Sequence, residues 1–148
     1  MKLALAAVGR IKEPELRALL DDYYGRIRRY ADFAEVEVRE ERDDKVLAAF
    51  ERALAAQGPR AQLVAMEVTG ELVTSDGLAA KVGELMRDAA VPVFAIGGAE
   101  GLPRALRERA KWKVSLGRIT LPHRLARLVL AEQLYRAFTI LKGEAYNK

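Results

Sequence analysis

The sequence contains no cysteine and a single histidine, and it has no long hydrophobic run. Without cysteine, the chain cannot form disulfide scaffolds, zinc–thiolate sites, iron–sulfur clusters or thiol nucleophiles, and its other side chains suggest no metal site. No apolar run approaches the roughly 20 residues needed to span a membrane. The first 30 residues contain acidic side chains and lack the apolar segment and cleavage site of a secretory signal. We therefore expect a soluble cytoplasmic protein.

Composition and length predict one folded domain over residues 1–148. Hydrophobic residues make up 51% of the chain and charged residues 31%, which excludes disorder driven by high charge. The net charge is +4, but residues 1–100 carry 14 basic and 18 acidic side chains, whereas residues 101–148 carry 11 and 3. A basic block within a folded segment is typical of a surface that binds nucleic acid. An arginine-rich surface selected for heat resistance would show the same bias.

Strands alternate with helices along the chain. Short apolar or alternating segments predict strands at Lys2 to Val8, Phe33 to Val38, Leu63 to Val68, Val91 to Ile96 and Trp112 to Leu116. Helical spacing of apolar residues predicts helices that begin near Pro14, Val46, Ser75, Leu102 and Pro122. This order implies an α/β layered sandwich with a mainly parallel sheet of about five strands. In such a fold, ligands bind beyond the carboxyl ends of the strands, which points to the loops at Gly97 and Gly117 and to the segment from Met66 to Gly70.

Two segments could carry chemistry. The glycine-rich turn from Ile96 to Leu102 follows a predicted strand and lets a ligand approach the backbone closely. It matches neither the dinucleotide-binding nor the Walker fingerprint, and a purely structural turn explains it equally well. The loop from Leu116 to His123 brings apolar and hydroxyl side chains, a cation and the histidine to the start of the last helix. A structural connector with a packed histidine is the alternative.

Both segments also carry a resemblance to a known family. Ile96-Gly97-Gly98-x-x-Gly101-Leu102 is followed by Leu116 to His123, then by Glu132 to Ala137, and finally by the tail from Gly143 to Tyr146. With these motifs in this order, the chain resembles the bacterial 23S ribosomal RNA pseudouridine N3-methyltransferase family of the SPOUT superfamily. The resemblance covers the whole chain, including the Met-Lys-Leu opening.

The resemblance implies a fold, a cofactor and a partner. It implies an S-adenosyl-L-methionine-dependent enzyme with a C-terminal trefoil knot, which modifies 23S rRNA in the assembled ribosome and works as a homodimer through its last helix. The apolar stripe that could serve this interface, or an ordinary core, is Leu125, Leu128, Val129, Tyr135, Phe138 and Leu141. Carried over by position, the cofactor-binding residues are Met66, Gly97, Leu116, Gly117, Arg118, Ile119, Thr120 and Leu121.

The resemblance and the basic block together suggest residues for the RNA side of the reaction. Cations near the base would stabilise its deprotonated imide. The candidate catalytic residues are His123, Arg124 and Tyr146, and the candidate RNA-binding residues are Arg124, Arg127, Arg136 and Lys142.

The tail departs from the family pattern at one position. Members commonly have histidine after the tail tyrosine, but here Asn147 follows Tyr146, and an asparagine side chain cannot act as a general base. The tail would then position the base through a hydrogen bond that an amide can replace, or the proton would pass to solvent, or activity would be weakened. Two alternatives to a methyltransferase are a non-catalytic protein that binds RNA or the ribosome, and a small-molecule α/β enzyme that binds a nucleotide at Gly97 and Gly98.

Overall fold

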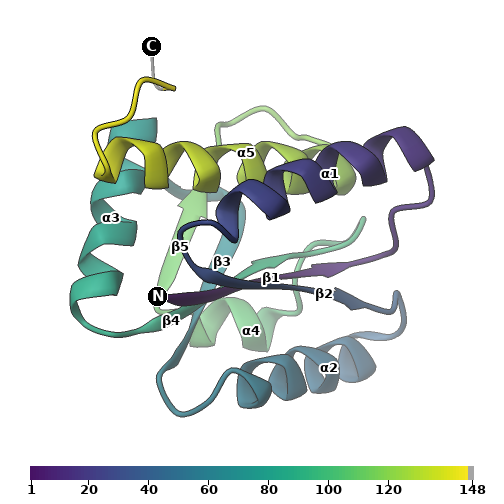
Figure 1. The fold of residues 1–148 in the computed structure, drawn as a ribbon. Coiled ribbons are helices and arrows are strands. Elements are labelled where there is room, and N and C mark those ends of the chain that lie inside the picture. The colour runs from purple at the N-terminus through teal and green to yellow at the C-terminus, as the bar shows by residue number, and fades with distance from the viewer. Residues whose placement is uncertain (147–148) are drawn as a thin grey trace.

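The structure, a computed structural model that describes residues 1–146, is a five-stranded parallel sheet between two layers of helices (Figure 1). The strands are β1 (Lys2–Val8), β2 (Asp32–Val38), β3 (Ala61–Leu72), β4 (Val91–Ile96) and β5 (Trp112–Ser115). The helices are α1 (Pro14–Ile27), α2 (Asp43–Ala56), α3 (Ser75–Arg87), α4 (Arg104–Arg109) and α5 (His123–Leu141). The strand order is β2-β1-β4-β3-β5 and every pair is parallel. The predicted α/β sandwich is confirmed, and the C-terminal knot stays a prediction.

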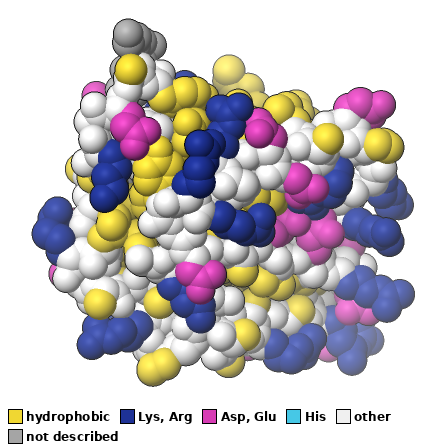
Figure 2. All heavy atoms as spheres, in the orientation of Figure 1, with side chains coloured by type: hydrophobic (Ala, Val, Ile, Leu, Met, Phe, Trp, Pro, Cys, Tyr) yellow, Lys and Arg dark blue, Asp and Glu magenta, His cyan; other side chains and the backbone are white. Residues whose placement is uncertain are grey.

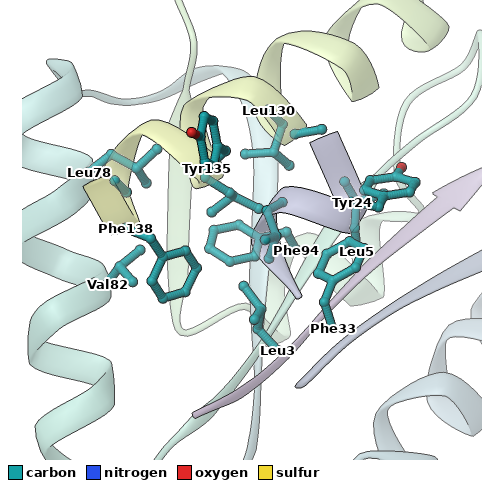
Figure 3. Close-up of a cluster of buried hydrophobic side chains, with 14 of the residues drawn as sticks. Leu3, Leu5, Tyr24, Phe33, Leu78, Val82, Phe94, Leu130, Tyr135 and Phe138 are labelled. Atoms are coloured by element: carbon teal, nitrogen blue, oxygen red, sulfur yellow. The ribbon is translucent and has the colours of Figure 1, made fainter. Parts of the chain in front are cut away.

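Strand β1 shows how the sheet divides the core into two clusters. Its side chains alternate, so that Leu3 and Leu5 join the cluster beneath α1, α3 and α5, while Ala4 and Ala6 join the cluster beneath α2 and α4. Because both faces are buried, the strand is almost continuously apolar, as predicted from Lys2 to Val8. In the larger cluster, side chains from β1, β4, α1, α3 and α5 point toward one another (Figure 3).

Helix α5 presents a different face to the core from the one that the sequence predicts. Leu125, Val129 and Leu141, which were assigned to its apolar stripe, are exposed. The helix packs on α1 and α3, and these contacts select its buried face. That face consists of Arg127, Leu130, Ala131, Leu134, Tyr135, Ala137, Phe138 and Thr139. Three positions of the predicted stripe therefore do not belong to the core of this chain, and the interface alternative for them stays a prediction.

Strand β3 runs beyond the predicted end at Val68 and is irregular where it does so. Its pairing with β5 shifts between Met66 and Glu71, both of which lie opposite Val114. The extra residues form a bulge, a feature that redirects side chains and is common beside functional sites. Gly70 crosses β5 so closely that a Cβ atom there would lie 2.8 Å from backbone atoms of Lys113 and Val114. Across residues 1–146, no helix is long and apolar enough to cross a membrane.

Candidate functional site

A cavity of about 730 Å³ lies where the neighbouring strands β4, β3 and β5 end. Its position agrees with the rule that ligands bind at the carboxyl ends of parallel strands. The residues predicted to bind the cofactor that line this cavity are Met66, Gly97, Leu116, Gly117, Ile119, Thr120 and Leu121. The two segments singled out in the sequence, the turn at Gly97 and the loop from Leu116, therefore line the same cavity. Met66, which lies in β3 and is distant in the sequence, lines the same cavity.

The turn after β4 depends on the absence of a side chain at Gly97. A Cβ atom at this position would lie 2.3 Å from the Gly101 carbonyl carbon and 2.5 Å from the Leu102 nitrogen. Such distances are far below van der Waals contact, so the turn folds back on Gly97 only because it is glycine. The Gly101 N–H donates to the Gly98 oxygen at 3.0 Å and closes the turn. Backbone groups of this turn thus form one wall of the cavity.

Arg118 is the predicted cofactor-binding residue that does not line the cavity. Its guanidinium donates to the backbone oxygens of Val68 and Gly70, the latter at 3.0 Å. The Ser115 hydroxyl accepts from the Gly117 N–H at 3.1 Å and lies 2.9 Å from the Val68 oxygen. Together these hydrogen bonds hold the loop after β5 against the bulge in β3. The Arg118 side chain therefore fixes the position of this loop without lining the cavity.

Arg127 corrects a sequence-based prediction. Its side chain is 0% exposed, so it cannot contact RNA as predicted. Its Nη1 atom lies 2.6 Å from a Glu37 oxygen and 3.3 Å from a Glu35 oxygen, and its Nη2 atom donates to the Gly9 oxygen at 3.0 Å. Arg17 adds a second cation 2.9 Å from Glu35. The basic block thus uses one of its arginines to neutralise carboxylates of β2 and to hold the loop after β1.

The same network shifts two ionisation equilibria. Burial and a 2.5 Å hydrogen bond to the Glu35 carboxylate raise the pKa of Tyr24, whose hydroxyl stays a donor. Burial opposes ionisation of Glu37, but hydrogen bonds from Arg127 and from the Ile11 N–H outweigh it and lower the pKa of this carboxyl. The Glu37 carboxylate is therefore held ionised while it accepts from the Ile11 N–H of the loop after β1.

His123 lies at the edge of the cavity, at the start of α5. Its Nδ1 atom is buried and has no hydrogen-bond partner among residues 1–146. Gly9 passes so close that a Cβ atom there would lie 3.3 Å from the His123 Cε1 atom. The Arg127 network, which fixes the Gly9 carbonyl, therefore also fixes the backbone that packs against His123.

Tyr146 lies away from the cavity of its own chain. Its ring packs on Tyr135 with centroids 4.7 Å apart, and the Arg136 guanidinium lies 4.8 Å from its centroid. Burial and the Glu132 carboxylate are the main reasons why the pKa of Tyr146 is raised to about 12. Along α5, Tyr135 is about 14 Å from the cavity-lining Ala126 at 1.5 Å per residue. The structure thus separates Tyr146 from His123, although the sequence grouped them.

The other predicted cations are distributed along α5. Arg124 is half-exposed and lies 3.4 Å from Glu13 at the cavity end. Arg136 is largely covered and pairs with Glu132 at 2.6 Å, whereas Lys142 is exposed at the far end. Figure 2 shows Lys and Arg side chains beside a hydrophobic area where α5 lies over α1 and α3. Asn147 lies outside the described residues.

Comparisons with known proteins agree with this architecture. A family model described as "Predicted SPOUT methyltransferase" matches residues 1–147. A ribosomal RNA large subunit methyltransferase H from Sorangium cellulosum is 48% identical over 147 residues, with 99% of each chain covered. A protein of the same name from Geobacter metallireducens is 43% identical over 153 residues, with 99% of each covered.

Solved structures share the fold at low sequence identity. A probable methylase family protein from Haemophilus influenzae has a TM-score of 0.62 and 10% identity, covering 99% of this chain and 70% of that one. The SpoU methyltransferase AviRb from Streptomyces viridochromogenes, in complex with AdoMet, has a TM-score of 0.52 and 15% identity. That comparison covers 91% of this chain and 57% of AviRb.

Proposed function

This chain belongs to the SPOUT methyltransferase family and is an rRNA methyltransferase that uses S-adenosylmethionine, and we propose that it methylates N3 of a pseudouridine in the 23S rRNA of the assembled ribosome. The observation that carries the proposal is the single cavity formed by the Gly97 turn and the loop from Leu116 to Leu121. The full-length match to two rRNA large subunit methyltransferases supports the substrate class. The proposal places the reaction in the cytoplasm, with the ribosome.

The residues of the cavity suit an adenosyl cofactor. Its walls combine apolar side chains, such as Met66 and Leu116, with backbone donors and acceptors of the Gly97 turn, as small-molecule sites usually do. S-adenosylmethionine, when bound, supplies a methyl group already activated on a sulfonium. The protein therefore has to bind the cofactor, exclude water and hold the acceptor nitrogen in line with the methyl group.

The acceptor side of the reaction requires groups that favour a deprotonated imide. His123 lines the cavity, so it is the proposed group that orients the base or accepts its proton. Arg124 follows directly, and Arg10 and Lys12 are exposed in the loop that packs near His123. These cations would bind phosphate and stabilise the anionic base.

A direct test measures methyl transfer from labelled S-adenosylmethionine. We expect label in 23S rRNA of intact ribosomes and, after nucleoside digestion and mass spectrometry, on N3 of a pseudouridine. Isothermal titration calorimetry with the cofactor provides the control for a competent pocket. Cofactor binding without transfer would support a non-catalytic RNA- or ribosome-binding protein. Absence of cofactor binding, or a label on another nucleoside, would contradict the proposal.

The distance between Tyr146 and the cavity leads to a proposed homodimer. If Tyr146 and His123 act on the same base, the tail must come from a second copy of the chain. Within one chain, Tyr146 packs on Tyr135, whereas His123 lines the cavity at the start of α5. Leu125 and Val129, exposed near the cavity end of α5, offer apolar surface for such a contact. In this arrangement the tail of one chain completes the cavity of its partner.

Mixing two inactive variants tests the shared site. We combine His123→Ala, which damages the cavity, with Tyr146→Ala, which damages the tail, by co-expression with different tags. If the sites are shared across a two-fold dimer, heterodimers contain one intact site, and the mixture should recover about a quarter of wild-type transfer. Each variant alone is the control. No recovery, with a dimeric mass by light scattering, would place cavity and tail in the same chain.

A further inference from the structure

One carboxylate that lines the cavity has a single polar partner among the described residues. Glu67, the first residue of the bulge in β3, lines the cavity with a side chain that is only 14% exposed. Its one polar contact within residues 1–146 is an ion pair, in which the Arg107 Nε atom lies 3.5 Å from Oε1. An ionised carboxylate accepts about four hydrogen bonds, and buried charge without partners is costly. Glu67 therefore lines the cavity with hydrogen-bonding capacity that the described residues leave unused.

The geometry of this pair is poor for a structural brace. Charge-assisted hydrogen bonds between guanidinium and carboxylate are about 2.7–2.9 Å long and often use two parallel N–H groups. On the same helix, α4, the Arg104 Nε atom lies 2.7 Å from a Glu108 carboxylate oxygen. A short ion pair thus forms on this helix, whereas the pair between Arg107 and Glu67 is longer. Arg107 also lines the cavity and is 47% exposed, which leaves its terminal N–H groups available. The structure thus holds an acceptor and a donor side by side with unused capacity.

We propose that Glu67 and Arg107 bind the amino-acid end of S-adenosylmethionine. The α-ammonium and α-carboxylate of that end form a zwitterion, and the two side chains present the complementary charges in adjacent positions. Glu67 accepts from the ammonium, and Arg107 donates to the carboxylate. The inference rests on the proposed function, because it assigns residues to the cofactor within the same cavity. It leaves the adenosyl part to the Gly97 turn and the loop from Leu116 to Leu121.

Neutral substitutions and truncated ligands test the assignment by affinity alone. The variants are Glu67→Gln and Arg107→Gln, with Arg104→Gln on the exposed part of α4 as the matched control. Calorimetry measures their affinities for S-adenosylhomocysteine and for 5′-methylthioadenosine, which shares the neutral thioether nucleoside but lacks the amino-acid end. We expect each of the two variants to lower the affinity for S-adenosylhomocysteine by about tenfold, which corresponds to one lost interaction of roughly 1.4 kcal/mol. Affinity for 5′-methylthioadenosine should change by less than about twofold, because this ligand lacks the charged amino-acid end that the two side chains would bind.

The other outcomes each contradict a different statement. Equal losses for both ligands would mean that Glu67 holds the ribose or the adenine, and the assignment would be wrong. Unchanged affinities, or a lower melting temperature as the only effect, would make the pair a structural brace. If the wild-type protein binds neither ligand nor S-adenosylmethionine, the proposed function itself fails. If the wild-type protein binds these ligands and the variants bind them with the same affinities, only the assignment of Glu67 and Arg107 is wrong.

Discussion

Replacing Gly97 with alanine should lower the affinity for S-adenosylmethionine by roughly ten- to a hundredfold. The added Cβ atom would lie 2.3–2.7 Å from three backbone atoms of Gly101 and Leu102. Backbone atoms cannot rotate away as a side chain would, so the turn has to open. Overpacking of this kind costs about 1–3 kcal/mol, and every 1.4 kcal/mol lost from a binding site is about tenfold in affinity. Isothermal titration calorimetry measures the effect directly.

The matched control is Gly101→Ala in the same turn. No atom lies within 4 Å of a Cβ atom at Gly101, but its φ of +77° costs a non-glycine residue about 1–2 kcal/mol. We therefore expect Gly101→Ala to lower the melting temperature while the cavity wall stays in place. Wild-type cofactor affinity in Gly97→Ala, with the fold intact by circular dichroism, would show that the turn is not part of the cofactor site.

The sequence predicted this site because the sheet is parallel. The turn at Gly97 and the loop at Leu116 each follow a strand, and strands that run the same way end at the same edge. No knowledge of strand order was needed to expect them at one end of the molecule. Their place around one cavity did require that β4, β3 and β5 be neighbours, which local periodicity does not encode.

The segment from Met66 to Gly70 was expected near a ligand, but Glu67 was not singled out, because the sequence does not show the bulge that contains it. The stretch around Thr69 and Gly70 resembles the end of a strand, so the predicted strand stopped at Val68. Gly70 is instead required where β3 passes β5 without room for a side chain. The shift in register between Met66 and Glu71 separates Glu67 from regular pairing with β5. A single sequence shows the glycine but not the strand that passes over it.

Arg127 was misassigned because arginine is usually exposed. The positional signal was present, since Arg127 precedes Leu130 and Leu134 by three and seven residues and so shares their buried face. Its partners were also visible, because Glu35 and Glu37 are two residues apart and project from one face of β2. Nothing in the local pattern, however, pairs a strand near the beginning of the chain with a helix near its end.

Replacing Arg127 with methionine should destabilise the protein by about 3 kcal/mol. The substitution keeps most of the apolar stem but removes the charge that lies 2.6 Å from Glu37 and 3.3 Å from Glu35. Loss of one partner from a buried ion pair costs about 3–5 kcal/mol, and the lower end applies because Arg17 still neutralises Glu35. Urea denaturation should show a lower midpoint. The control, Arg124→Met, removes a half-exposed pair with Glu13 and should change stability by less than about 1 kcal/mol.

The pH dependence of unfolding separates a lost charge pair from a simple packing defect. In the wild-type protein, burial raises the pKa of Glu37, but hydrogen bonds from Arg127 and the Ile11 N–H outweigh it and lower the pKa below its ordinary value of 4.5. A lowered pKa in the folded state stabilises the protein above pH 4.5, and this contribution is lost as the pH falls through the folded value. The wild type should therefore lose stability on acidification below that pH, and Arg127→Met should lose less. Parallel pH profiles for the two proteins would mean that Arg127 contributes through packing alone. In that case, the Gly9 loop and His123 would not depend on the ionised Glu37 carboxylate for their position.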